Sequence, residues 1–269
     1  MTATIRELSE LEDLQQLAEL FAEVWGRSGQ PSVDSDILKA LSYSGNYVSG
    51  AYQDGRLIGG LVGWLGGLPP GELHMHSHIL GVIAGSEARG LGFELKQHQR
   101  TWCLERGIDV MEWTTDPLVR RNLYFNLRKL GASATRYLVN FYGAMTDGLN
   151  AGEESDRLLI RWQLGSPEAR DAAAGRAPAL ETDRLIAAGA SPILSVGDSG
   201  EPVAGPSSDA RVLLCQVPAD IVELRHTDAS LARSWRLALR SALTGTLARG
   251  YAITGATRSG SYVLESQPE

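Results

Sequence analysis

The distribution of apolar and polar positions predicts the first elements of the chain. Leucines and Phe21 recur at three- and four-residue intervals over residues 8–21, which indicates an amphipathic helix with Thr4 or Ser9 as its cap. Residues 47–52 and 57–65 are two apolar runs separated by Asp54-Gly55, a dipeptide typical of tight turns. These runs predict a β-hairpin, and a loop rich in glycine and proline follows at residues 66–71.

A strand followed by a glycine loop and a helix is predicted next. Residues 73–83 are apolar and β-branched toward their end, so they predict a strand. Side chains alternate between the two faces of a strand, and one face is predicted to carry His74, His76, His78, Leu80 and Val82. Residues 85–92 form the loop, residues 91–106 the helix, and residues 108–113 a second buried strand.

The second half of the chain contains further predicted elements. Asp116-Pro117 is expected to open a helix that runs to Leu130, because aspartate caps a helix well and proline fits its first turn. Strands are predicted at residues 136–142 and 158–164. The tail predicts a strand (211–217), a helix (228–249) and a strand with a glycine break (251–264). The alternation of helices and strands indicates an α/β or α+β sandwich, and we assign the α/β class.

Composition and charge exclude several classes of protein. The net charge of −7 argues against a general nucleic-acid binder, which needs a basic face. No run reaches the roughly 18 apolar residues of a membrane span, and the acidic N-terminus does not resemble a signal peptide. The two cysteines, far apart in sequence, predict no disulfide framework, so we expect a cytoplasmic protein with no membrane or nucleic-acid partner.

The charge is unevenly distributed along the chain. Between Arg89 and Arg136 the basic residues outnumber the acidic ones, although the chain as a whole is acidic. A local basic region in an acidic protein favours a small polyanion over a polymeric one. Chance clustering of charges on solvated helix faces is an equally good explanation when the charge is considered alone.

The loop Glu87-Ala88-Arg89-Gly90-Leu91-Gly92 is the strongest candidate site. A strand that passes through glycines into a helix leaves the first N–H groups of the helix unpaired, and the helix dipole adds positive potential there. Such a junction binds anions, most naturally a pyrophosphate. A lone pair of glycines is often only a turn, so the adjacent Arg89 and the flanking strand and helix strengthen the prediction.

The segment VIAGSEARGLGFELKQHQ resembles the acetyl-CoA motif of the GNAT acyltransferases, R/Q-x-x-G-x-G/A. The segments HMHSHILGV, EWTTDPLVRRNLYFNLRKLGA, DGLNAGEESDRLLIRWQL and, in the tail, WRLALRSALTGTLARGYAITG resemble a bacterial branch of predicted GNAT enzymes. The resemblance implies a three-layer sandwich with a mixed, mostly antiparallel central sheet and a C-terminal α/β extension. We place a GNAT domain at residues 1–165. The alanine-rich and loop-like composition of residues 166–210 predicts a linker or irregular connection, and residues 211–269 are predicted to form a strand–helix–strand extension.

The resemblance also implies an acyl-CoA cosubstrate, bound in this chain by groups of the glycine loop and the residues before it: Val82, Ile83, Ala84, Arg89, Gly90, Leu91 and Gly92. Asn122 and Asn126, four residues apart on one face of the predicted helix, are further candidates for binding the cofactor. Contacts with the strand edges, or an ordinary place on the helix surface, are the alternatives for these two asparagines. Two positions depart from the family pattern. Glu87 stands where Gln or Arg is usual, and Leu127 stands where the family often has a tyrosine. Tyr124, one helical turn earlier, is the nearest replacement for protonating the leaving thiolate.

Histidines on the strand are the candidates for the catalytic base. An amine that attacks a thioester must lose a proton, and histidine titrates near neutrality, so we predict this role for His76 or His78. A structural role in the sheet is the alternative. Three histidines at alternate positions could also hold a metal, but no carboxylate or cysteine completes an obvious ligand set, and we expect no metal.

The acceptor is predicted to be a small-molecule amine. Arg128 and Arg157 are candidates for binding the carboxylate of an amino acid that receives an acetyl or succinyl group. A catalytically silent acyl-CoA-binding or sensor module is the alternative, since the family tyrosine is absent and Glu87 is acidic. A third reading is a metal- or phosphate-ligand protein that shares only the loop. The sequence is compatible with a monomer or a homodimer.

Overall fold

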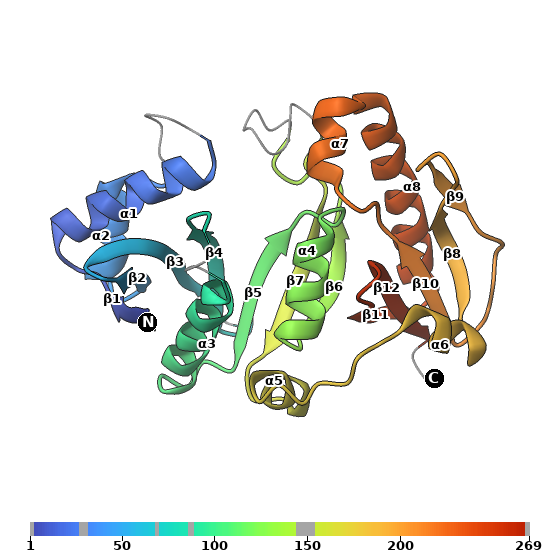
Figure 1. The fold of residues 1–269 in the computed structure, drawn as a ribbon. Coiled ribbons are helices and arrows are strands. Elements are labelled where there is room, and N and C mark those ends of the chain that lie inside the picture. The colour runs from blue at the N-terminus through green and yellow to red at the C-terminus, as the bar shows by residue number, and fades with distance from the viewer. Residues whose placement is uncertain (1–2, 27–31, 68–69, 86–88, 144–153, 267–269) are drawn as a thin grey trace. The chain divides into compact units, whose positions relative to one another are not determined.

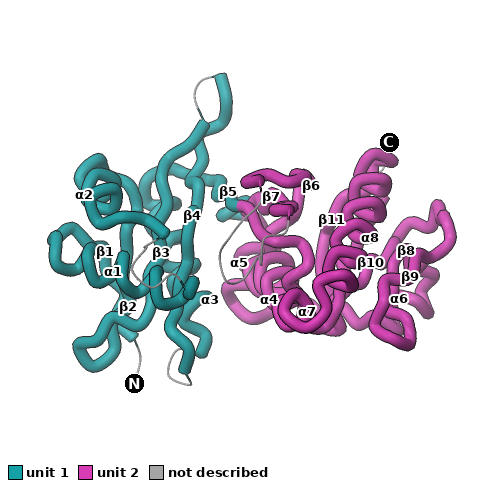
Figure 2. Tube along the Cα trace, turned by 90° about the horizontal axis from the view of Figure 1, so that it is seen from above, with its two compact units in different colours: residues 1–113, 147–149, 163–165 teal, residues 114–146, 150–162, 166–269 magenta. Residues whose placement is uncertain are grey.

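The computed structural model describes residues 3–26, 32–67, 70–85, 89–143 and 154–266. The chain divides into two compact units, shown in teal and magenta in Figure 2. Unit 1 comprises residues 1–113, 147–149 and 163–165, and unit 2 comprises residues 114–146, 150–162 and 166–269. Each unit is described by itself.

The sheet of unit 1 runs in the order β1 (Thr4–Glu7), β2 (Tyr47–Gln53), β3 (Arg56–Gly66), β4 (His74–Val82) and β5 (Val110–Thr115). The first four strands pair antiparallel, whereas β4 and β5 are parallel. The predicted hairpin is confirmed, and Asp54 and Gly55 both take positive φ values of 51° and 79°, as its tight turn requires. Residues 4–7 differ from the prediction, because they pair with β2 instead of joining the first helix.

Helices cover both faces of this sheet (Figure 1). Consecutive residues of a strand face opposite sides of the sheet, and Gly59 and Gly60 of β3 meet different helices. A Cβ added at Gly59 would meet Leu91 of α3 (Leu91–Leu104), whereas one added at Gly60 would meet Leu17 of α1 (Leu11–Val24). Helix α2 (Ser35–Tyr43) packs beside α1. Unit 1 is therefore a three-layer sandwich with a mostly antiparallel sheet, and the predicted fold class is confirmed.

A β-bulge in β4 corrects one prediction about its faces. Val62 pairs with Ile79 and Gly63 pairs with Ser77, so His78 is an extra residue in β4. Beyond the bulge the alternation of faces changes phase. Leu80 lies near Gly92 at the start of α3, while the ring of His76 lies against those of Trp64 and His78. The prediction that the three histidines share a face with Leu80 and Val82 is wrong, since it assumed a regular strand.

Unit 2 contains a second set of strands, in the order β7 (Arg157–Gln163), β6 (Ser133–Leu138), β11 (Tyr251–Ala256), β12 (Ser261–Ser266), β10 (Val212–Gln216), β8 (Ser191–Val196) and β9 (Pro202–Ala204). Its helices are α4 (Arg120–Tyr124), a π-helical turn η1 (Phe125–Lys129), α5 (Pro167–Ala173), α6 (Thr182–Ala187), α7 (Ile221–Thr227) and α8 (Ala229–Ala248). The strand–helix–strand pattern predicted for the tail corresponds to β10, α8 and the β11–β12 pair.

The helix expected from Asp116 begins later than predicted. Its N-cap is Val119, and a π-helical turn replaces the regular helix from Phe125 onward. Asp116 accepts the N–H of Leu118 at 3.0 Å, so it forms a local turn. Its other oxygen accepts a hydrogen bond from Arg225 of α7 at 2.6 Å, an ion pair that the sequence pattern did not reveal.

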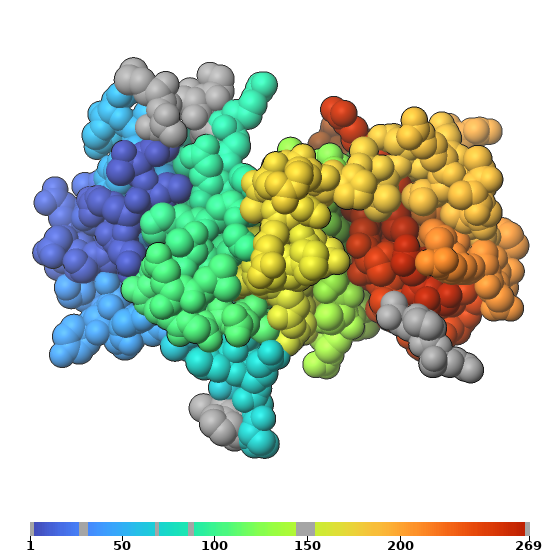
Figure 3. All heavy atoms as spheres, turned by 90° about the horizontal axis from the view of Figure 1, so that it is seen from below, coloured from blue at the N-terminus to red at the C-terminus, as the bar shows by residue number. Residues whose placement is uncertain are grey.

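The segment 166–210, for which the sequence indicated a linker or irregular connection, carries two helices and two strands. Leu180, Leu185 and Ala190 pack against Leu214 and Val263 of the C-terminal strands. Figure 3 shows the yellow and orange atoms of this segment beside the red atoms of the C-terminal elements. The alanine- and glycine-rich composition of the segment therefore conceals a packed part of unit 2.

Candidate functional site

The start of α3 has the geometry that anion binding needs. Gly90 is its N-cap with φ +88°. Among the described residues, no side chain caps the helix, and an added Cβ at Gly90 would meet no atom within 4 Å. Phe93 and Glu94 both donate to the carbonyl of Gly90, so helical pairing begins only after Leu91 and Gly92. Gly90 and the neighbouring Arg89 are exposed. These residues fit a bound pyrophosphate, which would accept from the free N–H groups and face the positive end of the helix dipole.

Not all of the backbone groups predicted to contact the cofactor just before the loop are free to do so. The N–H of Ile83 donates to the carbonyl of Ile58 at 3.0 Å and is already used. Val82 is the last residue of β4, and Ala84 is exposed. Glu87, the departure from the family pattern, lies outside the described residues.

The strands β4 and β5 separate soon after they pair. Within the described residues, their register covers only Met75 with Met111 and His76 with Glu112. Strand β4 nevertheless continues to Val82, still paired with β3 on its other side. We call the place where the two strands part, marked by Ser77 on β4 and Trp113 on β5, the fork. Beyond the fork, the edge of β4 on the side of β5 pairs with no strand among the described residues.

The predicted histidines come together beside the fork. The rings of His76 and His78 are 5.7 Å apart, and each packs against Trp64 of β3, at 5.0 and 4.5 Å between centroids. Burial lowers the pKa of His76 to about 4, with help from the charges of His78, His74 and Lys96, and the opposing effect of Glu112 is smaller. Burial also lowers the pKa of His78. Both imidazoles are therefore neutral at pH 7 and have a nitrogen able to accept a proton.

Glu112 is a candidate that the sequence analysis did not single out. Its carboxylate lies 3.8 Å from Nε2 of His74, and its backbone is in register with His76. The available signal was the presence of two acidic residues, Asp109 and Glu112, in the otherwise apolar run of residues 108–113. Only the parallel register brings this carboxylate to the histidines.

Lys96 of α3 was also missed. Its side chain is buried, its Nζ donates to Ser77 Oγ at 2.8 Å, and it lies 3.6 Å from the centroid of the Trp113 ring. Lys96, Gln99 and Cys103 are spaced by three and four residues, so the sequence did place two polar residues along a buried helix face. That pattern could have identified Lys96 and Gln99 as buried polar residues from the sequence.

Unit 2 holds the remaining predicted residues. Tyr124 and Asn122 are half-buried on α4, and Asn126 is buried in the π-helical turn. The π-helical turn begins at Phe125, between the two asparagines.

The two predicted carboxylate-binding arginines make contacts within unit 2. Arg128 donates through Nη2 to the carbonyl of Ala177. Arg157 is buried, donates to the carbonyl of Asp156 at 2.9 Å and lies 5.4 Å from the ring centroid of Tyr142. Burial lowers the pKa of Arg157, and the charge of Asp116 opposes the shift. Both arginines have a structural explanation, and acceptor binding by them remains a prediction.

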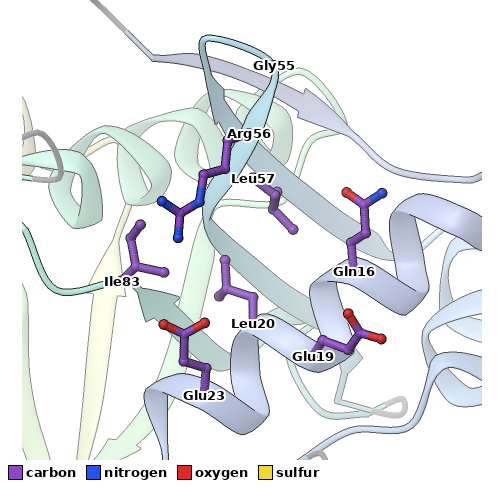
Figure 4. A pocket seen from close by; sticks show the side chains of 8 residues that line it. All are labelled: Gln16, Glu19, Leu20, Glu23, Gly55, Arg56, Leu57 and Ile83. Atoms are coloured by element: carbon purple, nitrogen blue, oxygen red, sulfur yellow. The ribbon is translucent and has the colours of Figure 1, made fainter.

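One hollow of about 440 Å³ lies on the α1 side of unit 1. In Figure 4, Glu19 and Glu23 of α1 and Arg56 of β3 extend toward it, and Ile83 is the one predicted site residue in its lining. Its charges are of both signs, so they favour no single ligand class. The described residues contain no group of three or more His, Cys, Asp or Glu able to hold a metal ion.

The segment that contains α3 matches a known protein family. Residues 11–131 match the model of the acetyltransferase (GNAT) family. This segment is of the GNAT family. It includes α1, the strands β2 to β5, the glycine loop, α3 and the helix that ends before Gly131. No curated protein matches the chain. No helix of the described residues has the length and apolar character to cross a bilayer.

Several solved structures are similar to this chain. Naa50 of Arabidopsis thaliana, in complex with the bisubstrate analogue CoA-Ac-MVNAL, is 18% identical over 60% of this chain and 98% of its own, with a TM-score of 0.48. Naa20 of Chaetomium thermophilum, also with a bisubstrate analogue, is 18% identical over 60% and 86%, with a TM-score of 0.49. An aminoglycoside 6'-acetyltransferase of type Ii is 16% identical over 61% and 98%, with a TM-score of 0.48.

Proposed function

We propose that this protein is an acyl-CoA-dependent N-acyltransferase acting on the amine of a small molecule, with an amino acid as the favoured acceptor. One observation carries the proposal. The segment of the GNAT family contains an uncapped, glycine-opened helix start and a fork between two parallel strands in one compact unit. The helix start would hold the pyrophosphate of CoA through Arg89, Gly90, Leu91 and Gly92.

The bound acyl-CoA supplies a thioester carbonyl activated for attack by nitrogen. In the proposed reaction the amine nitrogen forms a bond to that carbonyl carbon, the C–S bond breaks, and the thiolate takes up a proton. The protein must accept the proton that the attacking amine loses. His76 or His78 would accept it, since both are neutral at pH 7 and lie beside the fork.

Release of free CoA thiol tests this proposal. Acetyl-CoA and succinyl-CoA would each be offered with amino acids, polyamines, aminoglycosides and short peptides, and CoA binding would be measured by calorimetry. We expect binding together with thiol release that depends on an amine. Binding without turnover over the whole panel would favour the silent acyl-CoA-binding module, and an absence of CoA binding would exclude both. Turnover with peptides or polyamines alone would exclude the amino-acid acceptor.

Tyr124 is the proposed donor of the proton to the leaving thiolate, in place of the tyrosine that the family often has where this chain has Leu127. The variant Tyr124→Phe should lower kcat by about 10²-fold with little change in CoA affinity, as expected for the loss of a general acid. A variant with full activity would show that another group protonates the thiolate.

A further inference from the structure

Lys96 occupies an unusual place in unit 1. It is 4% exposed, and its ammonium group lies where β4 and β5 part, between Ser77 of β4 and Trp113 of β5. Its Nζ is also 3.8 Å from the sulfur of Met111. Among the described residues, no carboxylate lies within ion-pair distance of Lys96. A buried ammonium is costly without an opposite charge, so this position calls for an explanation.

The polar groups around Lys96 have more donors than acceptors. Lys96 donates to Ser77, and the hydroxyl of Ser77 donates in turn to Oε1 of Gln99 at 2.7 Å. The side chain of Gln99 is fully buried, and its Nε2 has no hydrogen-bond partner among the described residues. The cluster of Lys96, Ser77 and Gln99 therefore has unused N–H groups, and a positive charge whenever Lys96 is protonated, while its acceptors are already occupied. A ligand that complements it supplies oxygen atoms and a negative charge.

The fork and the helix start belong to the same strand–loop–helix unit. Strand β4 leads from Ser77 through Val82 toward the glycine loop, and α3 leads back from Gly90 to Lys96. A cosubstrate held by its pyrophosphate at the helix start, as proposed above, can extend along β4 toward the fork. The end of the molecule farthest from the pyrophosphate is its acyl group.

We propose that Lys96 and Gln99 select an acyl-CoA whose acyl group ends in a carboxylate, such as a succinyl group. The inference rests on the proposed function and names the class of acyl donor. The carboxylate would accept hydrogen bonds from Lys96 Nζ and Gln99 Nε2 and pair with the protonated form of Lys96. Charge-assisted hydrogen bonds of this kind are roughly twice as strong as neutral ones.

The protonation state of Lys96 supports this assignment. Burial lowers its pKa to about 7, and the nearby Cys103 opposes that shift. The thiol of Cys103 stays protonated, because burial raises its pKa to about 12. On β4, the group whose charge interacts with that of Lys96 is His76, and His76 is neutral above about pH 4. Glu112 of β5 interacts with His76. Lys96 is thus the group of this cluster that would take up a proton when a carboxylate binds.

Calorimetry without an amine acceptor tests the proposal directly. Succinyl-CoA and butyryl-CoA have the same number of acyl carbons, and only the first carries a carboxylate. We expect succinyl-CoA to bind at least about tenfold more tightly, as for a buried charge pair. At pH 8 its binding should take up a proton, seen in buffers of different ionisation heat, because the carboxylate raises the pKa of Lys96. Butyryl-CoA should take up none.

Two variants and a control separate this role from a purely structural one. Lys96→Met should remove both the preference for succinyl-CoA and the proton uptake, and Gln99→Leu should reduce the preference. Lys39→Met, which removes an exposed lysine of α2, should retain both. Equal affinities for the two acyl-CoAs in the wild type, or a preference that survives in Lys96→Met, would overturn the inference. If free CoA still binds in that case, the proposed function stands, whereas a failure of every CoA compound to bind refutes the function itself.

Discussion

At the residue scale, the residues proposed for the site differ in how readily the sequence pattern alone identifies them. Gly90 was recognisable, because a glycine between a strand and an amphipathic helix has a known role. Its φ of +88° in open space agrees with that role. Glu112 and Lys96 were not recognised, since their importance comes from neighbours on other elements: His74 for Glu112, and Ser77 and Trp113 for Lys96.

Gly90 provides the first prediction. Gly90→Asp places a carboxylate at the positive end of α3, where it would repel a pyrophosphate, so CoA affinity should fall by about tenfold or more. Gly90→Asn is the matched control, because asparagine tolerates positive φ and adds no charge. It should bind CoA more tightly than the aspartate variant. Calorimetry, with circular dichroism to verify folding, measures the difference, and equal affinities in two folded variants would contradict the assignment.

Lys96 also provides a prediction about stability. Its pKa is about 7 in the folded protein and about 10.4 in an unfolded chain, so the unfolded state holds more protons between these values. The free energy of unfolding should therefore rise with pH from about 7 to 10 through this group. Lys96→Met should be more stable than the wild type near pH 7, and the difference should shrink toward pH 10. Urea unfolding measures it, and parallel pH profiles would contradict it.

At the element scale, hydrophobic periodicity gave the right type for most helices and strands, and the irregularities changed what those elements do. The bulge at His78 turns Leu80 toward α3 and keeps His76 and His78 with Trp64. A π-helical turn interrupts the α-helix at Phe125, between Asn122 and Asn126. Neither irregularity has a local sequence signature, because each depends on how the neighbouring strand or helix packs.

Asp116 shows how an element boundary can depend on a distant partner. Burial alone would raise the pKa of its carboxyl, but the charges of Arg225 and Arg236 outweigh that effect and hold the pKa below its usual value. The stability from this ion pair is therefore present above the unfolded pKa of aspartate and is lost as the pH falls through the folded one.

Asp116→Ala should lower the free energy of unfolding at pH 7 by about 3–5 kcal/mol, because it leaves the Arg225 charge buried without this partner. The loss should shrink at acid pH, because the Asp116 carboxyl takes up a proton in the unfolded chain before it does so in the folded wild type, which removes the stabilisation. Urea titrations at pH 7 and pH 3 measure the difference between variant and wild type. A constant difference at both pH values would show that the carboxylate charge contributes nothing.

At the scale of the whole molecule, the division into units does not follow the order of the sequence. Residues 114–146 and 150–162 belong to the same unit as residues 166–269, and β6 pairs with β11 of the tail. A truncated chain of residues 1–165 would keep the strands and helices of unit 1 but leave part of unit 2 without its partners. Among those lost partners is Arg225, which pairs with Asp116.

We therefore expect the fragment 1–165 to be less stable than the full chain, with a broad unfolding transition and a lower Tm or poor solubility. Differential scanning calorimetry and circular dichroism of both proteins provide the measurement. A fragment that unfolds cooperatively at the Tm of the full chain would instead support an independent domain over residues 1–165.

The sequence by itself determined most of the helices and strands of this protein and located the glycine loop that we propose as the cofactor site. Turn residues such as Asp54-Gly55, the strand before the loop and the glycines at its end act through their immediate neighbours, so a linear pattern is enough to reveal them. The tertiary structure decided which side chains meet. The parallel register brings Glu112 to the histidines, the fork places Lys96 between two strands, and the fold joins Asp116 to Arg225 across more than a hundred residues. These contacts depend on how distant segments pack, and periodicity along the chain does not record that.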